Sequence, residues 1–395
     1  MRVRVIQPGT SFERPVPAPA ARPDSYGPWR PSAVLGAPAV GGLLLPAAQP
    51  TASWLYAPRA VHVDDRRVVV ADTGNHRVLV FDGVPSSDGA AADVVLGQRD
   101  AVTEGPQAAG AGPAGGMNLP TGVLVTPDGR LVVADAWNHR LLVWDRVPQA
   151  GGPPDLVLGQ ATPHDVEPNA GGEPSGRVFY WPFGIALVDG RFYVADTGNR
   201  RVLCWADGVP VSPDRPADVV LGQPDAVSRA ENRGGAAGPD SFRWPHAVTG
   251  TLTGGVLVAD AGNHRVLGWH AHPAADRAAD FVLGQPDLTG AAEFPYRPQT
   301  PTGFRFPYGV LAGAHGLAVA DTANNRVLIW PSPPASPVAE PAYVLGQPTF
   351  SANGENRWDA VAHDTLCWPY GLGAADGVLA VADSGNNRVV LWRRS

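Results

Sequence analysis

The sequence contains no lysine, and its 395 residues include only two cysteines and two methionines. All 30 basic residues are therefore arginine, which excludes Schiff-base lysines, lysine general bases and the lysine of a phosphate-binding loop. Cys204 and Cys367 are too few for a disulfide framework or a thiolate metal cage, and we expect no bond between them. Charged residues make up 17% of the chain and the net charge is -7, a poor match for a general nucleic-acid binder.

Long apolar segments are also missing. The run Gly41–Leu45 is far too short to span a bilayer, and no apolar segment follows the two early arginines as it would in a secretion signal. We therefore expect a soluble, cytoplasmic protein without membrane contact. Glycine (47) and proline (42) are abundant instead, which argues against long helices and favours many short segments joined by turns.

A repeat of about 62 residues organises the chain. Its main marker is a segment such as VVVADTGNHRVLVF, which recurs six times. The repeated aspartates are Asp72, Asp135, Asp196, Asp260, Asp321 and Asp383. A proline about fourteen residues earlier recurs with the same period, at Pro58, Pro120, Pro182, Pro245, Pro307 and Pro369. A third marker, V-L-G-Q, ends at Gln98, Gln160, Gln223, Gln285 and Gln347.

Each repeat contains four short apolar runs with the length and β-branched content of strands. In the second repeat they are Gly122–Val125, Leu131–Ala134, Leu141–Trp144 and Leu156–Leu158. Four antiparallel strands repeated six times predict an all-β fold, a six-bladed β-propeller. We assign residues 55–395 to the propeller as one domain and residues 1–54 to a proline-rich N-terminal segment.

The last repeat stops after its third strand, Val389–Trp392, and has no V-L-G-Q strand of its own. A spare V-L-G lies near the N-terminus, within Ala33–Gly36. Because an open ring would leave strand edges unpaired, we predict that this N-terminal strand pairs with the last blade and closes the ring.

The repeated [VL]-A-D-x-x-N-x-R-[VL] segment resembles the NHL repeat. The V-L-G-Q-P-D and [WF]-P-x-G elements are similar to those of bacterial NHL-repeat proteins, over about residues 55–395 and the strand near residue 34. The resemblance implies a propeller. It leaves function open, because NHL propellers serve as protein-binding modules, as RNA-binding modules and, in relatives, as lyases or lactonases.

Connections of about twenty residues, such as Arg99–Leu119, join each fourth strand to the next blade. The strand order places them on the same face as the Asp-containing turns, and loops of this length without strands are usually functional or disordered. Five of them hold one glutamate each: Glu104, Glu167, Glu231, Glu293 and Glu355. We favour a structural role for these carboxylates, capping loop amides or pairing with an arginine of the adjacent blade. An acidic ring around the channel mouth is the alternative.

Regular repetition favours structure for the other shared positions too. We expect each repeated aspartate to shape its turn. The arginine that follows five residues later could pair with an aspartate of its own blade or of a neighbouring blade. We expect one large aromatic per blade to pack between blades: Phe81, Trp144, Trp205, Trp269, Trp330 and Trp392. His76, His139 and His264 share one position with Arg200, Asn325 and Asn387, and blades 1, 2 and 4 are too unevenly spaced to favour a three-histidine metal site.

The residues that differ most between blades follow the phased prolines, where the innermost strands begin. They are Arg59, Thr121, Phe183, His246, Tyr308 and Tyr370. Four aromatics precede the same prolines: Trp181, Trp244, Phe306 and Trp368. This set predicts either a small-molecule or peptide pocket at the channel mouth or a plug of packed side chains, and we favour the plug slightly. His246 would suit a general base if it faced solvent, but no partner for it is evident.

The first functional hypothesis is a non-catalytic scaffold that binds a protein or ligand through the long-loop face. The alternative is a metal-dependent lyase or lactonase-like enzyme with its site in the channel, and RNA binding ranks third. We find no nucleophile elbow, no H-E-x-x-H and no catalytic Cys/His spacing, so we assign no catalytic residue, metal ligand or cofactor. We expect a protein partner, with a small-molecule ligand as the second choice and nucleic acid disfavoured.

Overall fold

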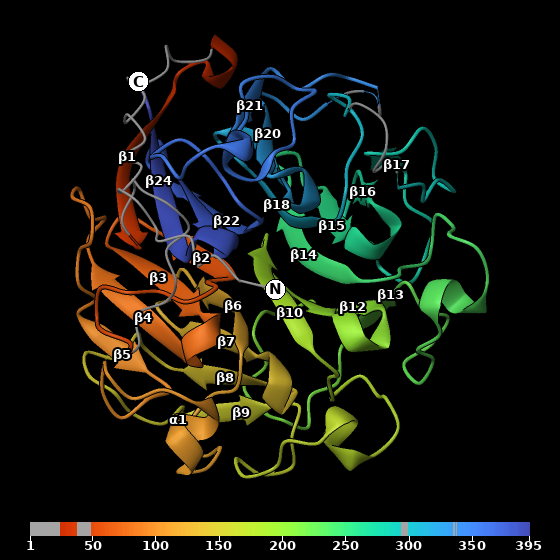
Figure 1. Ribbon diagram of the computed structural model, residues 1–395. Helices are drawn as coiled ribbons and strands as arrows, with labels where there is room; N and C mark the ends of the chain where they lie inside the picture. The colour runs from red at the N-terminus through yellow and green to blue at the C-terminus, as the bar shows by residue number, and fades with distance from the viewer. Residues whose placement is uncertain (1–23, 38–48, 294–298, 335, 337) are drawn as a thin grey trace, which may run out of the picture.

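Six four-stranded antiparallel sheets surround a central axis in the computed structural model, which describes residues 24–37, 49–293, 299–334, 336 and 338–395 (Figure 1). The predicted six-bladed β-propeller is confirmed. In each blade the first strand lies nearest the axis and the fourth lies at the rim. No helix among the described residues is long and apolar enough to cross a membrane.

The first three blades contain their strands in chain order. Blade 1 has β2 (Ala60–Val63), β3 (Arg67–Asp72), β4 (Arg77–Asp82) and β5 (Val94–Leu96). Blade 2 has β6 (Pro120–Val125), β7 (Leu131–Asp135), β8 (Arg140–Trp144) and β9 (Leu156–Leu158). Blade 3 has β10 (Pro182–Val188), β11 (Arg191–Asp196), β12 (Arg201–Trp205) and β13 (Val219–Leu221). The four strands predicted in the second repeat are confirmed, with ends that differ by two residues at most.

The next two blades repeat the pattern, and the sixth takes its outer strand from the N-terminal part of the chain. Blade 4 has β14 (Pro245–Gly250), β15 (Val256–Asp260), β16 (Arg265–Trp269) and β17 (Phe281–Leu283). Blade 5 has β18 (Pro307–Gly313), β19 (Gly316–Asp321), β20 (Arg326–Trp330) and β21 (Tyr343–Leu345). Blade 6 has β22 (Pro369–Ala375), β23 (Val378–Asp383), β24 (Arg388–Arg394) and β1 (Trp29–Gly36).

Helical structure is confined to single turns. A 3-10 turn joins the second and third strands of every blade: Thr73–Asn75, Ala136–Asn138, Thr197–Asn199, Ala261–Asn263, Thr322–Asn324 and Ser384–Asn386. Others lie in the long loops or before β1: Asp24–Tyr26, Pro168–Gly171, Glu231–Gly234 and Glu355–Trp358. The segment α1 (Pro106–Gly110) is a left-handed turn, because its three central residues have φ between 54° and 58°.

The ring is closed by β1, as predicted, although the strand is longer than the expected 33–36. It pairs antiparallel with β24, so that Val34 lies opposite Val390. The outer edge of β1 is covered in turn by blade 1, because the Val34 N–H donates to Asp88 and the Gly89 N–H donates to the Val34 carbonyl. The division at residue 54 stays a prediction, and most of the segment before it lies outside the described residues.

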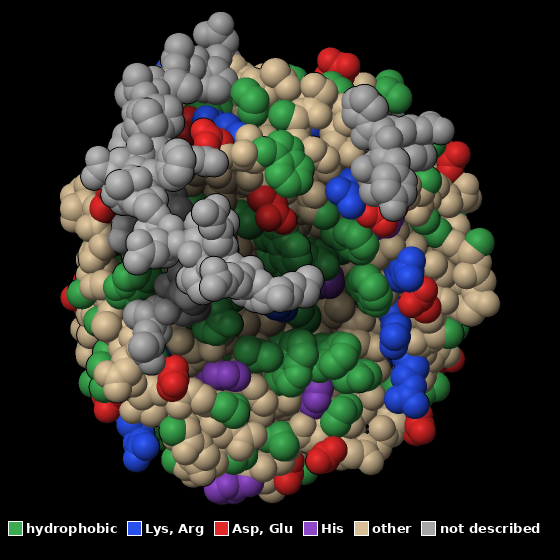
Figure 2. Space-filling model, in the orientation of Figure 1, with side chains coloured by type: hydrophobic (Ala, Val, Ile, Leu, Met, Phe, Trp, Pro, Cys, Tyr) green, Lys and Arg blue, Asp and Glu red, His purple; other side chains and the backbone are tan. Residues whose placement is uncertain are grey.

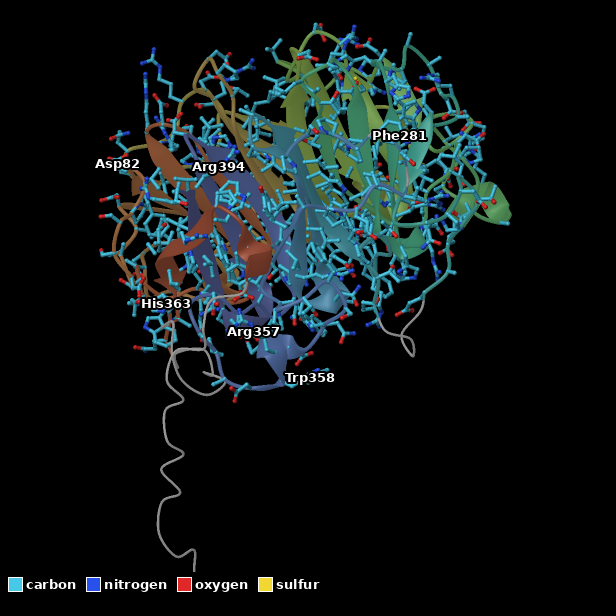
Figure 3. All side chains as sticks on the ribbon, turned by 90° about the horizontal axis from the view of Figure 1, so that it is seen from above. Asp82, Phe281, Arg357, Trp358, His363 and Arg394 are labelled. Carbon is cyan, nitrogen blue, oxygen red and sulfur yellow. The ribbon has the colours of Figure 1, made fainter. Side chains whose placement is uncertain are left out.

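The two faces of the disc differ in the loops that they carry. The long connections and the Asp-containing turns lie on one face, which we call the long-loop face. In Figure 3, Arg357, Trp358 and His363 mark this face. The labelled ends of outer strands, Asp82 and Phe281, lie on the opposite face.

The core lies between blades, where apolar side chains of neighbouring sheets meet. The aromatic residue near the end of each third strand is at most 4% exposed, as predicted for inter-blade packing. Burial of one such side chain contributes roughly 1.5–3 kcal/mol. Cys204 and Cys367 are also buried, and neither forms a disulfide.

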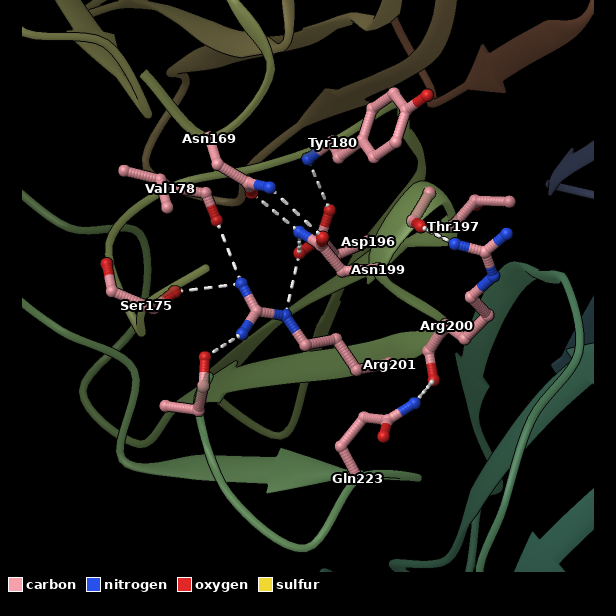
Figure 4. Close-up of polar contacts among 12 residues, drawn as sticks. Asn169, Ser175, Val178, Tyr180, Asp196, Thr197, Asn199, Arg200, Arg201 and Gln223 are labelled. Atoms are coloured by element: carbon pink, nitrogen blue, oxygen red, sulfur yellow. Dashed lines mark hydrogen bonds and ion pairs between the residues drawn. The ribbon is translucent and has the colours of Figure 1, made fainter. Parts of the chain in front are cut away.

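Each repeated aspartate forms a buried ion pair with the arginine five residues later in its own blade, which is one of the two arrangements considered, and Figure 4 shows the pair in blade 3. The Asp196 carboxylate accepts Arg201 Nε at 2.7 Å, the Asn199 amide at 2.8 Å and the Tyr180 backbone N–H at 2.7 Å. The remaining guanidinium nitrogens of Arg201 donate to carbonyls of the two flanking long loops. The six Asp–Arg pairs therefore anchor the long loops to the blades, which gives the long-loop face a fixed shape.

Candidate functional site

The six innermost strands enclose a cavity of about 490 Å³ along the central channel. Consecutive residues of each of these strands line the cavity, and most of them are small or aliphatic, such as Val61, Val123, Ile185 and Leu372. The cavity is lined along the whole length of the inner strands, from Arg59 at the long-loop end to residues in the turns of the opposite face.

Five of the six predicted channel residues form a closed ring of side chains at the long-loop end of this cavity. Phe183 and His246 have ring centroids 4.5 Å apart, His246 and Tyr308 4.3 Å, and Tyr308 and Tyr370 4.6 Å. The Arg59 guanidinium completes the ring, 5.0 Å from the Tyr370 centroid and 5.7 Å from the Phe183 centroid. We call these five residues the channel ring.

Thr121, the sixth residue, is buried and too small to join the ring. Its Oγ1 donates to the Pro182 carbonyl at 3.1 Å. Arg59 therefore reaches past blade 2 to contact Phe183 in blade 3. The side chains cross the channel and close it toward the long-loop face. The choice between a pocket and a plug at this position stays a prediction.

In blades 2 to 6 the inner strands place these side chains by means of a bulge after the phased proline. The pairing register shifts there in blades 2 to 6, so the residue after the proline lacks a regular partner and turns toward the axis. The glycine that follows in four of the blades allows the close approach of the next strand. A Cβ on Gly184, for example, would lie 2.3 Å from the His246 carbonyl oxygen.

His246 is held in one tautomer. Its Nδ1 lies 2.9 Å from the Trp244 carbonyl oxygen, which can only accept, so Nδ1 carries the proton and Nε2 is the free acceptor. Burial lowers the pKa of His246 to about 4, the hydrogen bond to Trp244 opposes this shift, and the Arg59 cation adds to it. The imidazole is therefore neutral near pH 7 and too weak a base for the general-base role considered above.

Arg59 is the one guanidinium that lines the cavity within the described part of the chain. Its Nε is buried without a hydrogen-bond partner, and its contacts are the faces of Phe183 and Tyr370. Aromatic faces stabilise a cation only in part, because they neither neutralise the charge nor accept its N–H groups in full.

The four aromatics before the prolines lie outside the cavity, on the long-loop face, although Phe306 contacts Tyr308 of the channel ring, with ring centroids 6.3 Å apart. Trp181 stacks on Trp137 with centroids 5.1 Å apart, and Trp244 stacks on Phe306 at 6.3 Å. Trp368 is half exposed and donates its indole N–H to Glu355 at 3.0 Å. In Figure 2 this face is hollowed at its centre, with hydrophobic side chains around the hollow.

The glutamates of the long loops are mostly paired. Glu231 lies 3.0 Å from Arg243, and Glu293 lies 2.7 Å from Arg305. Each arginine precedes the first strand of the next blade. This is the structural role that the sequence favoured, and with Glu355 bonded to Trp368 it leaves no ring of five free carboxylates among the described residues.

The sequence did not reveal the role of the position shared by histidine and asparagine. In five blades its side chain accepts the backbone N–H of the residue before the next blade's proline, at 2.8–3.2 Å. The acceptors are His76, His139, His264, Asn325 and Asn387, and the donors are Leu119, Trp181, Phe306, Trp368 and Ala57. The occurrence of histidine in three blades and asparagine in two at this position was the signal in the sequence that could have revealed this role. His Nδ1 and Asn Oδ1 are both hydrogen-bond acceptors and lie at the same distance from Cβ.

Blade 3 breaks this pattern. Its residue at the shared position is Arg200, which has no acceptor atom, and the corresponding donor Trp244 lacks the positive φ of 46–51° found at the other five donors. The Trp244 carbonyl instead accepts both the Ala261 N–H and the His246 ring N–H. The exception in blade 3 therefore fixes the orientation of His246 in the channel ring.

No group of three or more His, Cys, Asp or Glu side chains within the described ranges could hold a metal ion. His76, His139 and His264 are each engaged with the backbone of the next blade, as described above. The channel ring, its apolar cavity and the long-loop face are thus the candidate functional features.

Comparison with known proteins identifies the repeat. A family model for the NHL repeat matches residues 55–81 and 117–144, which lie in the first two of the six repeats of this β-propeller. The WD40 β-propeller domain of Doa1 is similar, with 11% identity, a TM-score of 0.48 and coverage of 94% of this chain and 98% of that one. No curated protein matches the chain.

Two lyases are also similar in fold. A streptogramin B lyase has 11% identity and a TM-score of 0.44, and the match covers 90% of this chain and 97% of that chain. Virginiamycin B lyase from Staphylococcus aureus has 10% identity and a TM-score of 0.43, with coverage of 87% and 97%.

Proposed function

We propose that this chain is a non-catalytic binding module that receives a protein partner on its long-loop face. The observation that carries the proposal is the exposure of large aromatic side chains on that face. Tyr56 is 43% exposed, Trp368 50% and Trp358 79%. Tryptophan and tyrosine are the residues most enriched at the energetic centres of protein interfaces.

The anchoring of the long loops supports the same proposal. Arg201 and its equivalents donate to loop carbonyls on both sides. The glutamines of the V-L-G-Q marker add a further hydrogen bond to these loops, as Gln98 does by donating to the Gly105 carbonyl. Loops that are already ordered lose less conformational entropy when a partner binds. The face therefore suits a partner that docks on a rigid surface.

The test compares two double variants. Trp358→Ala/Trp368→Ala alters the long-loop face, and Val211→Ser/Val338→Ser alters exposed residues of the opposite face as a matched control. Tagged versions of both and of the unchanged protein are used to capture partners from the native host after chemical cross-linking. We expect one stoichiometric partner with the unchanged protein and the control, and its loss with the tryptophan variant. Equal recovery with all three would overturn the proposal.

The metal-dependent lyase or lactonase and the RNA-binding alternative stay predictions, and no specific contact in the described residues favours either of them. Location in the cytoplasm also stays a prediction.

A further inference from the structure

The electrostatics of the channel cavity are unbalanced. Of the described residues that line it, Arg59 is the only arginine and Asp189 the only carboxylate. Asp189 lies in the β10–β11 turn at the opposite end of the inner strand, where His272 Nε2 is 3.0 Å from its carboxylate. No carboxylate among the described residues pairs with Arg59, and a cation beside an apolar cavity is costly without a compensating charge.

Free hydrogen-bonding groups surround the same guanidinium. The hydroxyls of Tyr308 and Tyr370 and the Nε2 of His246 make no hydrogen bond to a described residue, although all three side chains line the cavity. Burial raises the pKa of both tyrosines, so the phenols keep their protons and remain donors. His246 offers an acceptor, because its proton is on Nδ1.

A simple plug does not require this composition. Blades 3, 5 and 6 supply Phe183, Tyr308 and Tyr370 to the ring, and an apolar side chain at position 59 would fill the gap without burying a charge. The arginine breaks the pattern of the ring at the point where Thr121 leaves extra room. Departures from the symmetry of a scaffold are where sites are expected.

We propose that the channel cavity binds a small organic monocarboxylate whose carboxylate pairs with Arg59 and whose apolar body lies between the inner strands. A guanidinium pairs with a carboxylate through two parallel hydrogen bonds. A single cation balances one negative charge, whereas a phosphate dianion would leave a second negative charge uncompensated, because Arg59 is the only arginine among the described residues that line the cavity. Val61, Val123, Ile185 and Leu372 supply the apolar wall.

The size and the opening of the cavity fit this ligand. Its volume of about 490 Å³ lies within the range of small-molecule sites, roughly 300–1,000 Å³. The channel ring closes it toward the long-loop face, so a ligand enters from the opposite face, where Leu252 and Asp189 lie at the rim. This site is therefore separate from the face proposed above for a protein partner.

The test measures binding of octanoate and 3-phenylpropionate to the full chain by titration calorimetry and thermal shift. The neutral amides octanamide and 3-phenylpropionamide are the ligand controls. Arg59→Met removes the charge and keeps an unbranched side chain, whereas Arg66→Met removes an exposed arginine of the β2–β3 turn as the matched control. Trp358→Ala/Trp368→Ala tests independence from the long-loop face.

We expect at least one carboxylate to bind and to raise the melting temperature, and its amide to bind roughly tenfold more weakly or worse. Arg59→Met should bind the carboxylate more weakly by a similar factor, and the other variants should bind it as tightly as the unchanged protein does. Equal binding of acid and amide, or no binding of either acid, would overturn the proposal. The comparison of acid with amide uses the unchanged protein, so it decides the question even if Arg59→Met fails to fold.

Discussion

His139 Nδ1 accepts the backbone N–H of Trp181 across the boundary between blades 2 and 3, at 3.1 Å. The same bond joins His76 to Leu119 and His264 to Phe306. Each of these donors has a positive φ, a conformation that non-glycine residues seldom adopt, and the bond helps to hold it. Because Nδ1 must be unprotonated to accept, these three inter-blade bonds depend on neutral histidine.

The first prediction concerns acid stability. Burial lowers the pKa of all three histidines, and that of His139 to about 4. In the unfolded chain the histidines have a pKa near 6.5, so below that pH the unfolded chain binds more protons than the folded protein does. The contribution of these histidines to the free energy of unfolding is therefore complete above about pH 6.5 and is lost as the pH falls toward 4. His139 alone should contribute up to about 3 kcal/mol across this window.

Urea unfolding at several pH values checks this prediction. The matched variant replaces His76, His139 and His264 with asparagine, which two other blades already use at this position. It should unfold like the unchanged protein at pH 7.5 and show a flatter loss of stability between pH 6.5 and 4. An unchanged slope would mean that other groups control the acid response.

A second prediction follows from the exception in blade 3. Arg200→Asn supplies an acceptor for the Trp244 N–H, so Trp244 should adopt the positive φ of its five equivalents. Its carbonyl would then turn away from His246, whose Nδ1 would lose its acceptor. Nitrogen NMR of the imidazole should report a change in the His246 tautomer, with Arg200→Lys as the control that supplies no acceptor. An unchanged His246 spectrum in Arg200→Asn would contradict the coupling.

A third prediction concerns the buried ion pairs. Arg201→Met leaves the Asp196 carboxylate at the blade's centre without its cation and frees three loop carbonyls. Removal of one partner of such a pair costs roughly 3–5 kcal/mol. Arg201→Lys should recover little, because lysine cannot reproduce the planar fork. Arg66→Met, at an exposed arginine, should stay within about 0.5 kcal/mol of the unchanged protein in the same unfolding experiment.

A fourth prediction tests the close approach of the inner strands. Gly184→Ala would place a Cβ 2.3 Å from the His246 carbonyl oxygen, so blades 3 and 4 must separate. We expect a destabilisation of about 1–3 kcal/mol. Gly152→Ala, where an added Cβ meets nothing within 4 Å, is the control. Thermal unfolding of both variants measures the difference, and equal melting temperatures would show that the strands move apart freely.

The fold was predictable because the sequence pattern of one blade recurs six times along the chain. Three markers with one period specify the blade, and the missing fourth strand of the last repeat points to Ala33–Gly36 as the closing strand. The repeat also indicated that Asp196 and Arg201 form ion pairs, and the structure shows that they pair with each other across one tight turn. Contacts within one repeat can be read from that repeat.

The channel ring and the histidine bonds were less accessible to sequence reasoning. The residues of the ring were identified, but its order depends on Arg59 reaching past Thr121 to Phe183, which joins blades that are not neighbours. The hydrogen bond between His139 and Trp181 joins residues 42 positions apart and depends on the positive φ of Trp181. That conformation cannot be predicted from the residue type at this position. Contacts between repeats depend on how the blades stack, and a single repeat does not contain that information.

Closure by β1 also determines the order in which this protein can be completed during its synthesis. Residues of β1 leave the ribosome first, yet their partner β24 is made last, more than 350 positions later. Until then, Val34 and its neighbours have an unpaired edge, and blade 6 lacks its outer strand. The disc therefore reaches its closed form only after β24 has emerged, and a chain that ended before β24 would expose the edges of β1 and of blade 6 together.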